Sequence, residues 1–447
     1  MGKLFGTDGV RGIANEDLTP ELAYQLGRVG AHVLLKNKKN TKVVIGKDTR
    51  ISGDLLEAAM TAGFLSMGVD VVSLDVIPTP AVSYLTRALK ADAGVMISAS
   101  HNPAEYNGIK FFTSEGYKLP DQVEEEMEKY ILNDEEIELR PTGDQVGTYS
   151  KLDAITEYAD YLKTTIQGDF NGLKIAVDPG NGAAYQVAPK LLKELGAEVF
   201  IINENPDGIN INDHCGSTHP EKVQQLVKET GADIGLAFDG DADRLIAVDD
   251  QCQIVDGDHI LAICGTFLKN QGKLKKNTVV ATVMSNIGLD MAMKEENCQV
   301  VKTKVGDRYV LEEMVQKGYS LGGEQSGHII FLDYNTTGDG LLTAIQLITT
   351  VKSENKPLSD LAAMMTSYPQ VLVNAKVQKD NKEAYLKDEV IMSEIKKIED
   401  LMAGQGRVLI RPSGTEPLVR VMLEGKDQDQ LNELAQSLAK MIEERLG

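Results

Sequence analysis

The sequence predicts an α/β protein with three related α/β domains and a smaller C-terminal α+β domain. The first observation is length, because the chain has 447 residues and one domain usually holds about 100–200. The second is a strand–turn–helix–strand pattern that begins three times, near residues 42, 173 and 278. The third is a different order of strands and helices in the last part of the chain.

The first repeat begins with the apolar strand Lys42–Ile45 and turns at Gly46-Lys47-Asp48. A helical segment and a second strand, Gly68–Val72, follow. Upstream, Thr19-Pro20 precedes leucines and valines at helical spacing, which predicts a capped amphipathic helix.

The second and third repeats have the same order of elements. The predicted segments are strand Leu173–Val177, helix Ala184–Leu195 and strand Gly196–Phe200, and then strand Thr278–Val283, helix Leu289–Glu296 and strand Gln299–Thr303. Three βαβ-like units in one chain indicate three domains of one type.

The C-terminal part is predicted to be α+β. Its strands are Val371–Val377, Arg407–Ile410 and Leu418–Leu423, its helices Tyr385–Met402 and a final helix with Leu431, Leu434, Leu438, Met441 and Ile442 on one face. Breaks near Arg140–Gly147, Asp256-Gly257 and Ser367-Tyr368-Pro369 divide the chain into domains 1–150, 151–254, 255–367 and 368–447.

Charge and cysteine content exclude several classes of function. The formal net charge is −21, a field that repels nucleic acids and anionic membrane surfaces. None of the four cysteines forms a CxxC pair or has zinc-site spacing to a histidine. No signal peptide is evident, and the longest apolar run, near Ile260–Leu268, is too short to span a bilayer. We therefore expect a cytoplasmic protein that binds neither nucleic acid nor membrane.

A serine-containing loop follows the apolar strand Gly94–Ile97. It reads Ser98-Ala99-Ser100-His101-Asn102-Pro103, and a loop at a strand end can present one hydroxyl to a cleft. The residues around Ser98 and Ser100 lack the G-x-S-x-G pattern of serine hydrolases, so acyl transfer is disfavoured. An ordinary Ser/Asn/Pro turn remains the alternative.

Three alternating aspartates follow the apolar strand Ile234–Phe238. Asp239, Asp241 and Asp243 can point to one side of an extended segment, and such hard oxygen ligands suit Mg²⁺ or Ca²⁺. An EF-hand is excluded because Arg244 stands where its loop needs glycine. Arg244 beside the acids indicates a phosphate next to the metal, and a solvated acidic turn is the alternative.

Two further glycine-containing loops are candidates for ligand binding. In Gly322–His328, Glu324 and Ser326 lie two residues apart and could both contact vicinal sugar hydroxyls, although a simple turn explains this segment equally well. The other loop lies between two strands and resembles a phosphate cradle more than an ordinary hairpin turn. Its candidate residues are Arg411, Ser413, Gly414, Thr415 and Arg420. The N-terminal Phe5–Gly12 segment adds Thr7 and Arg11 as weaker candidates for anion binding.

Together these loops resemble the α-D-phosphohexomutases, over the whole chain and in the family's order: serine, metal, sugar and phosphate loops. Phe5–Gly12, Cys215–Pro220, Glu324-Gln325-Ser326 and Arg411–Pro417 resemble the branch that acts on glucosamine phosphates. The resemblance implies four domains around a central active-site cleft. It also implies that Ser100 is carried as phosphoserine and that Mg²⁺ binds this group together with the three aspartates.

The implied reaction is the reversible conversion of glucosamine 6-phosphate to glucosamine 1-phosphate through glucosamine 1,6-bisphosphate. Arg244 would neutralise the transferring phosphoryl group, and His101 and Lys110 would orient or deprotonate the hydroxyl partners. Some relatives have His where this chain has Asp307, which leaves the proton-transfer residue open. The resemblance also leaves open a homodimer and a diadenylate cyclase partner, neither of which any motif indicates. The alternatives are phosphomannomutase or phosphoglucomutase activity, and a non-catalytic sugar-phosphate-binding regulator.

Overall fold

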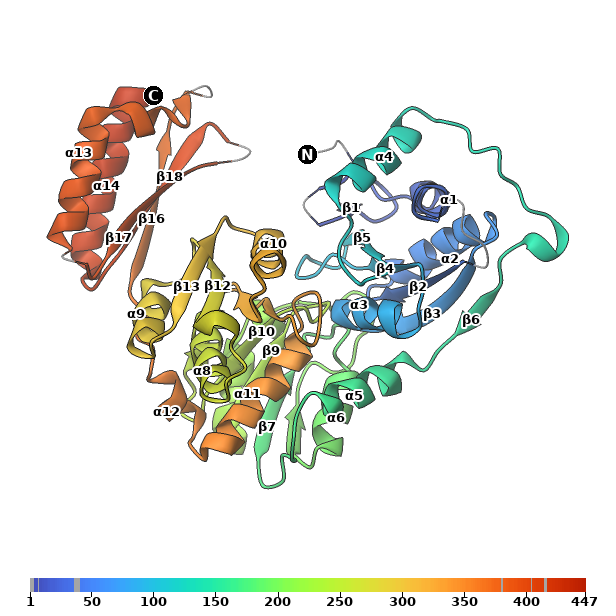
Figure 1. Ribbon diagram of the computed structural model, residues 1–447, viewed down its shortest axis with the longest axis horizontal. Helices are drawn as coiled ribbons and strands as arrows, with labels where there is room; N and C mark the ends of the chain where they lie inside the picture. The colour runs from blue at the N-terminus through green and yellow to red at the C-terminus, as the bar shows by residue number, and fades with distance from the viewer. Residues whose placement is uncertain (1–3, 7, 36–40, 379–380, 403, 414–415) are drawn as a thin grey trace. The chain divides into compact units, whose positions relative to one another are not determined.

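The computed structural model describes residues 4–6, 8–35, 41–378, 381–402, 404–413 and 416–447 (Figure 1). The chain forms two compact units. The larger contains Met1–Met284 and Val300–Ala363, and the smaller contains Ser285–Gln299 and Met364–Gly447. The larger unit has three sheets and the smaller unit has one.

The first sheet carries the serine loop. In spatial order its strands are β1 (Val10–Ile13), β5 (Tyr106–Thr113), β4 (Ala93–Ile97), β2 (Lys42–Lys47), β3 (Asp70–Val76) and β6 (Tyr149–Lys151). Its helices are α1 (Pro20–Leu34), α2 (Ser52–Leu65), α3 (Thr79–Ala88) and α4 (Asp121–Leu132). Helices α1, α2 and α4 share one apolar core with Val43 and Ile45 of β2. Thr19 caps α1 by accepting a hydrogen bond from Leu22 N, and Pro20 begins the helix, as the sequence predicts.

The second sheet carries the aspartate loop. Its strands, in order, are β11 (Ile254–Val255), β10 (Leu245–Val248), β9 (Ile234–Phe238), β7 (Lys174–Asp178) and β8 (Glu198–Ile201). The accompanying helices are α5 (Ala154–Thr164), α6 (Val187–Glu194) and α7 (Glu221–Thr230). Strands β7, β8 and β9 are parallel, and β9 is buried along its whole length, which explains its continuous apolar sequence.

The third sheet carries the glutamate–serine loop. Its strands, in order, are β13 (Gln299–Thr303), β12 (Thr278–Thr282), β14 (Leu321–Gly323) and β15 (Ile329–Phe331). Its helices are α8 (Gly257–Asn270), α10 (Asp307–Lys317), α11 (Gly340–Glu354) and α12 (Leu358–Ala362). Helix α11 is apolar on most of its circumference because it contacts α8, β9, β10 and β15.

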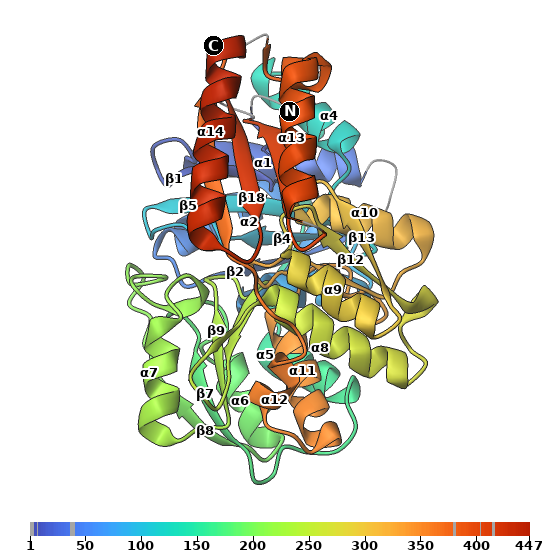
Figure 2. The same ribbon diagram turned by 90° about the vertical axis from the view of Figure 1, so that its left-hand side faces the viewer.

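The smaller unit is an α+β structure with a three-stranded antiparallel sheet (Figure 2). Its elements are α9 (Ile287–Glu295), β16 (Gln370–Lys376), α13 (Glu389–Leu401), β17 (Arg407–Pro412), β18 (Leu418–Glu424) and α14 (Gln428–Leu446). Helices α13 and α14 lie side by side against the sheet. Helix α14 buries Leu431, Leu438 and Ile442, three residues of the predicted apolar face.

The four candidate loops occupy equivalent positions in their sheets. Each joins two neighbouring antiparallel strands: β4 to β5, β9 to β10, β14 to β15, and β17 to β18. The chemistry-bearing residues therefore lie on tight connections between paired strands, where a short loop is anchored at both ends.

The predicted fold class is confirmed, and most predicted elements agree with the structure. One difference is the predicted helix Tyr385–Met402. A 3₁₀ turn at Ala384–Lys387 comes first, and Asp388 then caps α13 by accepting hydrogen bonds from Val390 N and Ile391 N. The periodicity continues through the turn because Tyr385 is also buried in the core. Among the described residues, no helix combines the length and apolarity needed to cross a membrane, and the four cysteines, all described, are free thiols.

Candidate active site

Ser100 stands at a strained position at the end of β4. Its φ is 52°, a left-handed conformation that is uncommon for residues other than glycine. Ser98 Oγ accepts a hydrogen bond from Ser100 N at 3.0 Å and donates to Asp48 Oδ2 at 2.5 Å. These buried contacts hold the strained backbone, so the orientation of the Ser100 hydroxyl is determined by its surroundings.

Arg50 and Asn212 hold the same loop through its carbonyl groups. Arg50 donates to Ser100 O at 2.9 Å and to Asn102 O at 2.8 Å, and its Nε pairs with Asp48 Oδ2 at 2.9 Å. Asn212 Nδ2 donates to the same two carbonyls at 2.9 and 3.2 Å. Neither Arg50 nor Asn212 could be predicted from the sequence, because each binds the loop through its backbone carbonyls, which no local motif reveals.

Replacing Arg50 by lysine should lower kcat about 10- to 100-fold while the protein stays folded, because an ammonium keeps the charge beside Asp48 but cannot reach all its carbonyl partners. Steady-state kinetics and thermal unfolding measure the two effects separately.

Arg28 provides the matched control. It is also a buried arginine bound to backbone carbonyls, at Ile137 and Leu139, away from the serine loop. Arg28→Lys should lower the melting temperature without a comparable change in kcat. Equal losses of kcat in both variants would contradict a specific role for Arg50.

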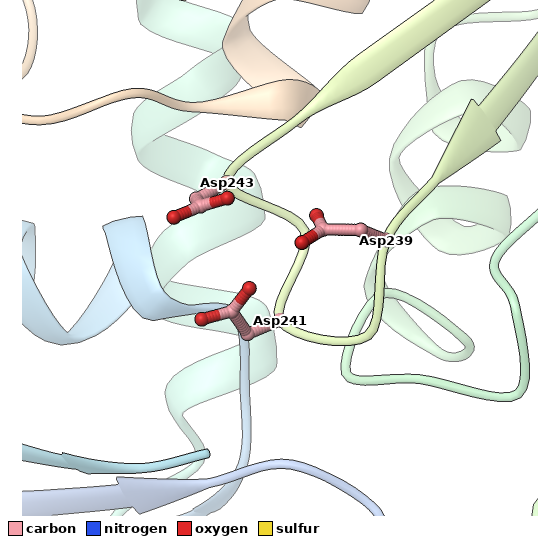
Figure 3. A group of neighbouring side chains, drawn as sticks. All are labelled: Asp239, Asp241 and Asp243. Atoms are coloured by element: carbon pink, nitrogen blue, oxygen red, sulfur yellow. The ribbon is translucent and has the colours of Figure 1, made fainter. Parts of the chain in front are cut away.

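The three aspartates form a compact, buried cluster on the loop between β9 and β10 (Figure 3). One oxygen from each lies within 4.8 Å of the others, and Figure 3 shows the three carboxylates converging. Asp241 Oδ1 and Asp243 Oδ1 are buried without a hydrogen-bond partner in the described structure. Buried carboxylate oxygens that face one another and accept no hydrogen bond suit a hard divalent cation such as Mg²⁺.

The pKa values of the aspartates in this cluster are shifted in different directions by their surroundings. Burial and repulsion from Asp243 and Asp241 raise the pKa of Asp239 well above its usual range. Burial also raises the pKa of Asp241, but the neighbouring Lys110 outweighs it and holds this pKa below its usual value. Lys110 Nζ and Thr79 Oγ1 donate to Asp241 Oδ2 at 2.8 and 2.7 Å. Hydrogen bonds therefore fix Asp241, whereas the contacts of Asp243 within the described residues are longer, at 3.8 Å to Arg244 Nε and to His328 Nε2.

The Ser100 hydroxyl points at this cluster. It donates to Asp239 Oδ2 at 2.7 Å, and His101 Nδ1 lies 3.2 Å from the same oxygen atom of Ser100. Burial and the positive charges of Arg244 and Arg11 lower the pKa of His101, which favours its neutral form. Lys110 differs: burial lowers its pKa, but Asp241 and Asp8 outweigh burial and hold the pKa above its usual value. Lys110 is thus a fixed cation that can orient groups, and its charge does not suit it to deprotonate them.

A cavity of about 650 Å³ opens beside Ser100 and brings together most of the predicted residues of the larger unit. The predicted residues that line it are Arg11, Ser100, His101, Asp243, Arg244 and Glu324. Arg244 N donates to Asp239 Oδ1 at 3.1 Å, while its Nε is buried and has no hydrogen-bond partner among the described residues. Ser326 is exposed and is not among the lining residues, so the structure pairs Glu324 with this cavity and leaves Ser326 outside it.

Four further residues of the cavity wall form a network of charged side chains that no sequence motif indicated. Lys118 Nζ pairs with Asp8 Oδ1 and Asp307 Oδ2, each at 2.6 Å, and Asp8 also pairs with Arg11. His328 Nε2 lies 3.6 Å from Asp307 Oδ2 and 3.8 Å from Asp243 Oδ2. His328 closes the glycine-rich segment quoted above, but nothing in that segment indicates that its ring reaches the metal loop.

The candidate phosphate cradle lies in the smaller unit. Arg411 and Arg420 are directly opposite each other on β17 and β18, and burial together with the charge of Arg420 lowers the pKa of Arg411. Two like charges facing each other across a strand pair are unfavourable unless an anion binds between them. Ser413 Oγ accepts a hydrogen bond from Glu416 N at 3.2 Å. The predicted residues Gly414 and Thr415, and Thr7 in the larger unit, lie outside the described residues.

Family models match nearly the whole chain. They describe phosphoglucomutase/phosphomannomutase alpha/beta/alpha domains I, II and III at residues 2–138, 152–253 and 256–368, and the C-terminal domain of the same family at residues 372–441.

Relatives agree with this match over full length. Phosphoglucosamine mutase from Alkaliphilus oremlandii is 74% identical, with 100% of both chains covered. Among solved structures, a phosphoglucomutase/phosphomannomutase family protein from Burkholderia thailandensis has a TM-score of 0.80 and 26% identity, and the match covers 99% of this chain and 97% of that one. Aspergillus fumigatus N-acetylphosphoglucosamine mutase, solved with GlcNAc-6P and magnesium, shares the fold with a TM-score of 0.67 at 18% identity, over 99% and 96% of the two chains. The chain belongs to the phosphoglucomutase/phosphomannomutase family of the phosphohexomutase superfamily.

Proposed function

We propose that this protein is an isomerase that interconverts glucosamine 6-phosphate and glucosamine 1-phosphate by moving a phosphoryl group through Ser100. The observation that carries the proposal is the Ser100 hydroxyl, which contacts a buried aspartate triad beside a cavity lined by Arg244 and Glu324. The choice of an amino sugar is supported by the name of the relative that is 74% identical over its full length.

Each residue near Ser100 has a distinct task in this proposal. Asp239, Asp241 and Asp243 would hold Mg²⁺, which supplies charge neutralisation to the phosphoryl group on Ser100. Arg244 lies beside the triad, with its buried Nε 3.8 Å from Asp243 Oδ1. This Nε has no hydrogen-bond acceptor among the described residues and can bind the transferring group. His101, neutral and next to Ser100 Oγ, can accept a proton, and Lys110 keeps Asp241 in place.

The sugar and its second phosphate bind outside this centre. Glu324 would accept hydrogen bonds from two neighbouring sugar hydroxyls, and the paired Arg411 and Arg420 would hold the phosphate that is not reacting. Phosphoserine donates its phosphoryl group to the free sugar hydroxyl, so glucosamine 1,6-bisphosphate forms. The bisphosphate then turns round and returns its other phosphoryl group to Ser100.

Turnover of three hexose 6-phosphates tests the proposal. Purified, phosphorylated protein with Mg²⁺ should convert glucosamine 6-phosphate with a higher kcat/KM than glucose 6-phosphate or mannose 6-phosphate. Preference for glucose or mannose phosphate would identify one of the alternative mutase activities. Absence of turnover with all three would support the non-catalytic binding protein instead.

Arg411→Ala should raise KM for glucosamine phosphate about 10- to 1,000-fold and lower kcat less, since a bidentate contact to a phosphate that stays in place binds ground and transition states alike. The same variant should release glucosamine 1,6-bisphosphate, because the intermediate loses part of its binding while it turns. Kinetics and chromatography of the reaction mixture measure both effects.

Arg445 is the control for this variant, because it is an exposed arginine of the same unit that pairs with Asp388 on a helix surface. Arg445→Ala should leave KM within a few-fold of the original value. If Arg411→Ala changes neither KM nor bisphosphate release, the loop between β17 and β18 is an ordinary turn.

A further inference from the structure

The Asp307 carboxylate lies in the cavity between the aspartate loop and Glu324, the residue proposed to hold the sugar. It is the first residue of α10, and its side chain lines the cavity beside Ser100. Its Oδ2 and the Oδ2 of Asp243 approach the same atom, His328 Nε2, at 3.6 and 3.8 Å. On the other side, the backbone N–H of Gly306 donates to Glu324 Oε1 at 3.1 Å. Asp307 therefore adjoins both the metal loop and the residue proposed to hold the sugar.

The Asp307 carboxylate remains charged and partly accessible. Lys118 Nζ pairs with Asp307 Oδ2 at 2.6 Å and also forms an ion pair with Asp8. The contacts to Lys118 and His328 both use Oδ2, and about a quarter of the side chain, 26%, is exposed. The Oδ1 atom can therefore face a ligand in the cavity.

The chemistry of an amino sugar matches this position. In glucosamine 6-phosphate the reacting oxygen is on C1, the amino group is on C2, and the next hydroxyl is on C3. When O1 faces Ser100 and the C3 hydroxyl faces Glu324, the C2 substituent faces the span between the metal loop and Glu324. A protonated amine at that position gains a charge-assisted hydrogen bond from a carboxylate, whereas a hydroxyl group gains a weaker one.

We infer that Asp307 binds the C2 ammonium group of the substrate and thereby determines the preference for amino-sugar phosphates over the corresponding hexose phosphates. This inference rests on the proposed function and deepens it, because it assigns the substrate class to one residue.

Asp307→Asn tests the inference through a ratio of specificities. We expect kcat/KM for glucosamine 6-phosphate to fall roughly 10- to 100-fold, which is the range of one charge-assisted hydrogen bond. The value for glucose 6-phosphate should change by less than about threefold, each reaction being supplied with its own 1,6-bisphosphate. If glucose phosphate turns over too slowly, inhibition constants of both 6-phosphates against glucosamine 1-phosphate turnover provide the ratio. Asp307→Glu keeps the charge and should retain part of the preference.

Lys118→Met separates recognition from structure, because it breaks the same ion pair from the other side. It should affect the two substrates to a similar extent and keep their ratio, whereas Asp307→Asn should not. An unchanged ratio in Asp307→Asn would overturn the inference and leave Asp307 as a structural partner of Lys118. Failure of the unmodified protein to convert any glucosamine phosphate would instead overturn the proposed function.

Discussion

Ser100→Ala should reduce mutase turnover at least about 10³-fold, because no other group can carry the phosphoryl group between the two positions of the sugar. The loss should appear in kcat and should not be restored by added bisphosphate, since a returning phosphoryl group has no acceptor. Intact mass measured before and after phosphatase treatment should show a labile phosphate on the unmodified protein, and phosphopeptide mapping should place it on Ser100.

The variant should nevertheless fold. The hydroxyl donates to the buried Asp239 and also contacts His101 Nδ1. Loss of the bond to Asp239 costs about 1–3 kcal/mol, a shift of several degrees in melting temperature at most. Alanine meets the same backbone strain as serine at φ 52°, so the loop gains no new penalty.

Ser114→Ala is the matched control, because Ser114 lies on an exposed turn after β5. It should keep both the phosphate and the turnover. Phosphate found only on other residues, or substantial turnover in Ser100→Ala, would contradict the role of Ser100.

The fully buried strands could be predicted from sequence because burial makes them continuous apolar runs. The run Ile234–Phe238 matches β9 residue for residue and is buried throughout. The predicted strand Gln299–Thr303 also matches β13, although β13 contains polar residues and is at most partly buried. Helix ends were less predictable where a turn has helical periodicity, as at Tyr385 before α13. Nor does local sequence indicate that α9 groups with the smaller unit, because long-range contacts such as Ile287 N to Glu424 Oε1 decide this.

The candidate site was predictable where its residues are contiguous. The serine and aspartate loops each place their reactive groups within a few residues, and the structure brings Ser100 and Asp239 into contact. Arg50 and Lys118 were not predictable, because they come from other segments and reach the site only when the chain is folded. His328 stands in the Gly322–His328 segment, but its approach to Asp243 likewise depends on the fold. The Cys215–Pro220 segment has such a role too: Gly216 N donates to the buried Asp178, and burial raises the pKa of Cys215 to about 12, so its thiol stays protonated.

Removing Mg²⁺ should abolish turnover and make the stability of the protein depend on pH in a defined direction. In the metal-free protein, burial and mutual repulsion raise the pKa values of Asp239 and Asp243. A carboxyl group whose pKa is higher in the folded state binds more protons there, so the free energy of unfolding falls as pH rises from the ordinary carboxyl pKa through the raised values. Mg²⁺ replaces those protons, so the melting-temperature increase it produces should grow over the same pH range.

Two variants of the triad should then change the stability of the metal-free protein in opposite directions. Asp243→Asn removes a buried charge that repels its neighbours, and should raise the melting temperature by roughly 1–2 °C for each kcal/mol of relieved repulsion. Asp241→Asn instead removes the nearer of two carboxylates that pair with the buried Lys110, while Asp8 remains at 3.1 Å. It should therefore destabilise the protein, by less than the roughly 3–5 kcal/mol expected for a fully uncompensated buried charge. Both variants should lose the stabilisation by Mg²⁺ and most of the turnover, because each removes a metal ligand. Calorimetry with and without a chelator measures these shifts. If Asp243→Asn is destabilised as much as Asp241→Asn without metal, or if either keeps the full response to Mg²⁺, then the three aspartates do not form the metal site.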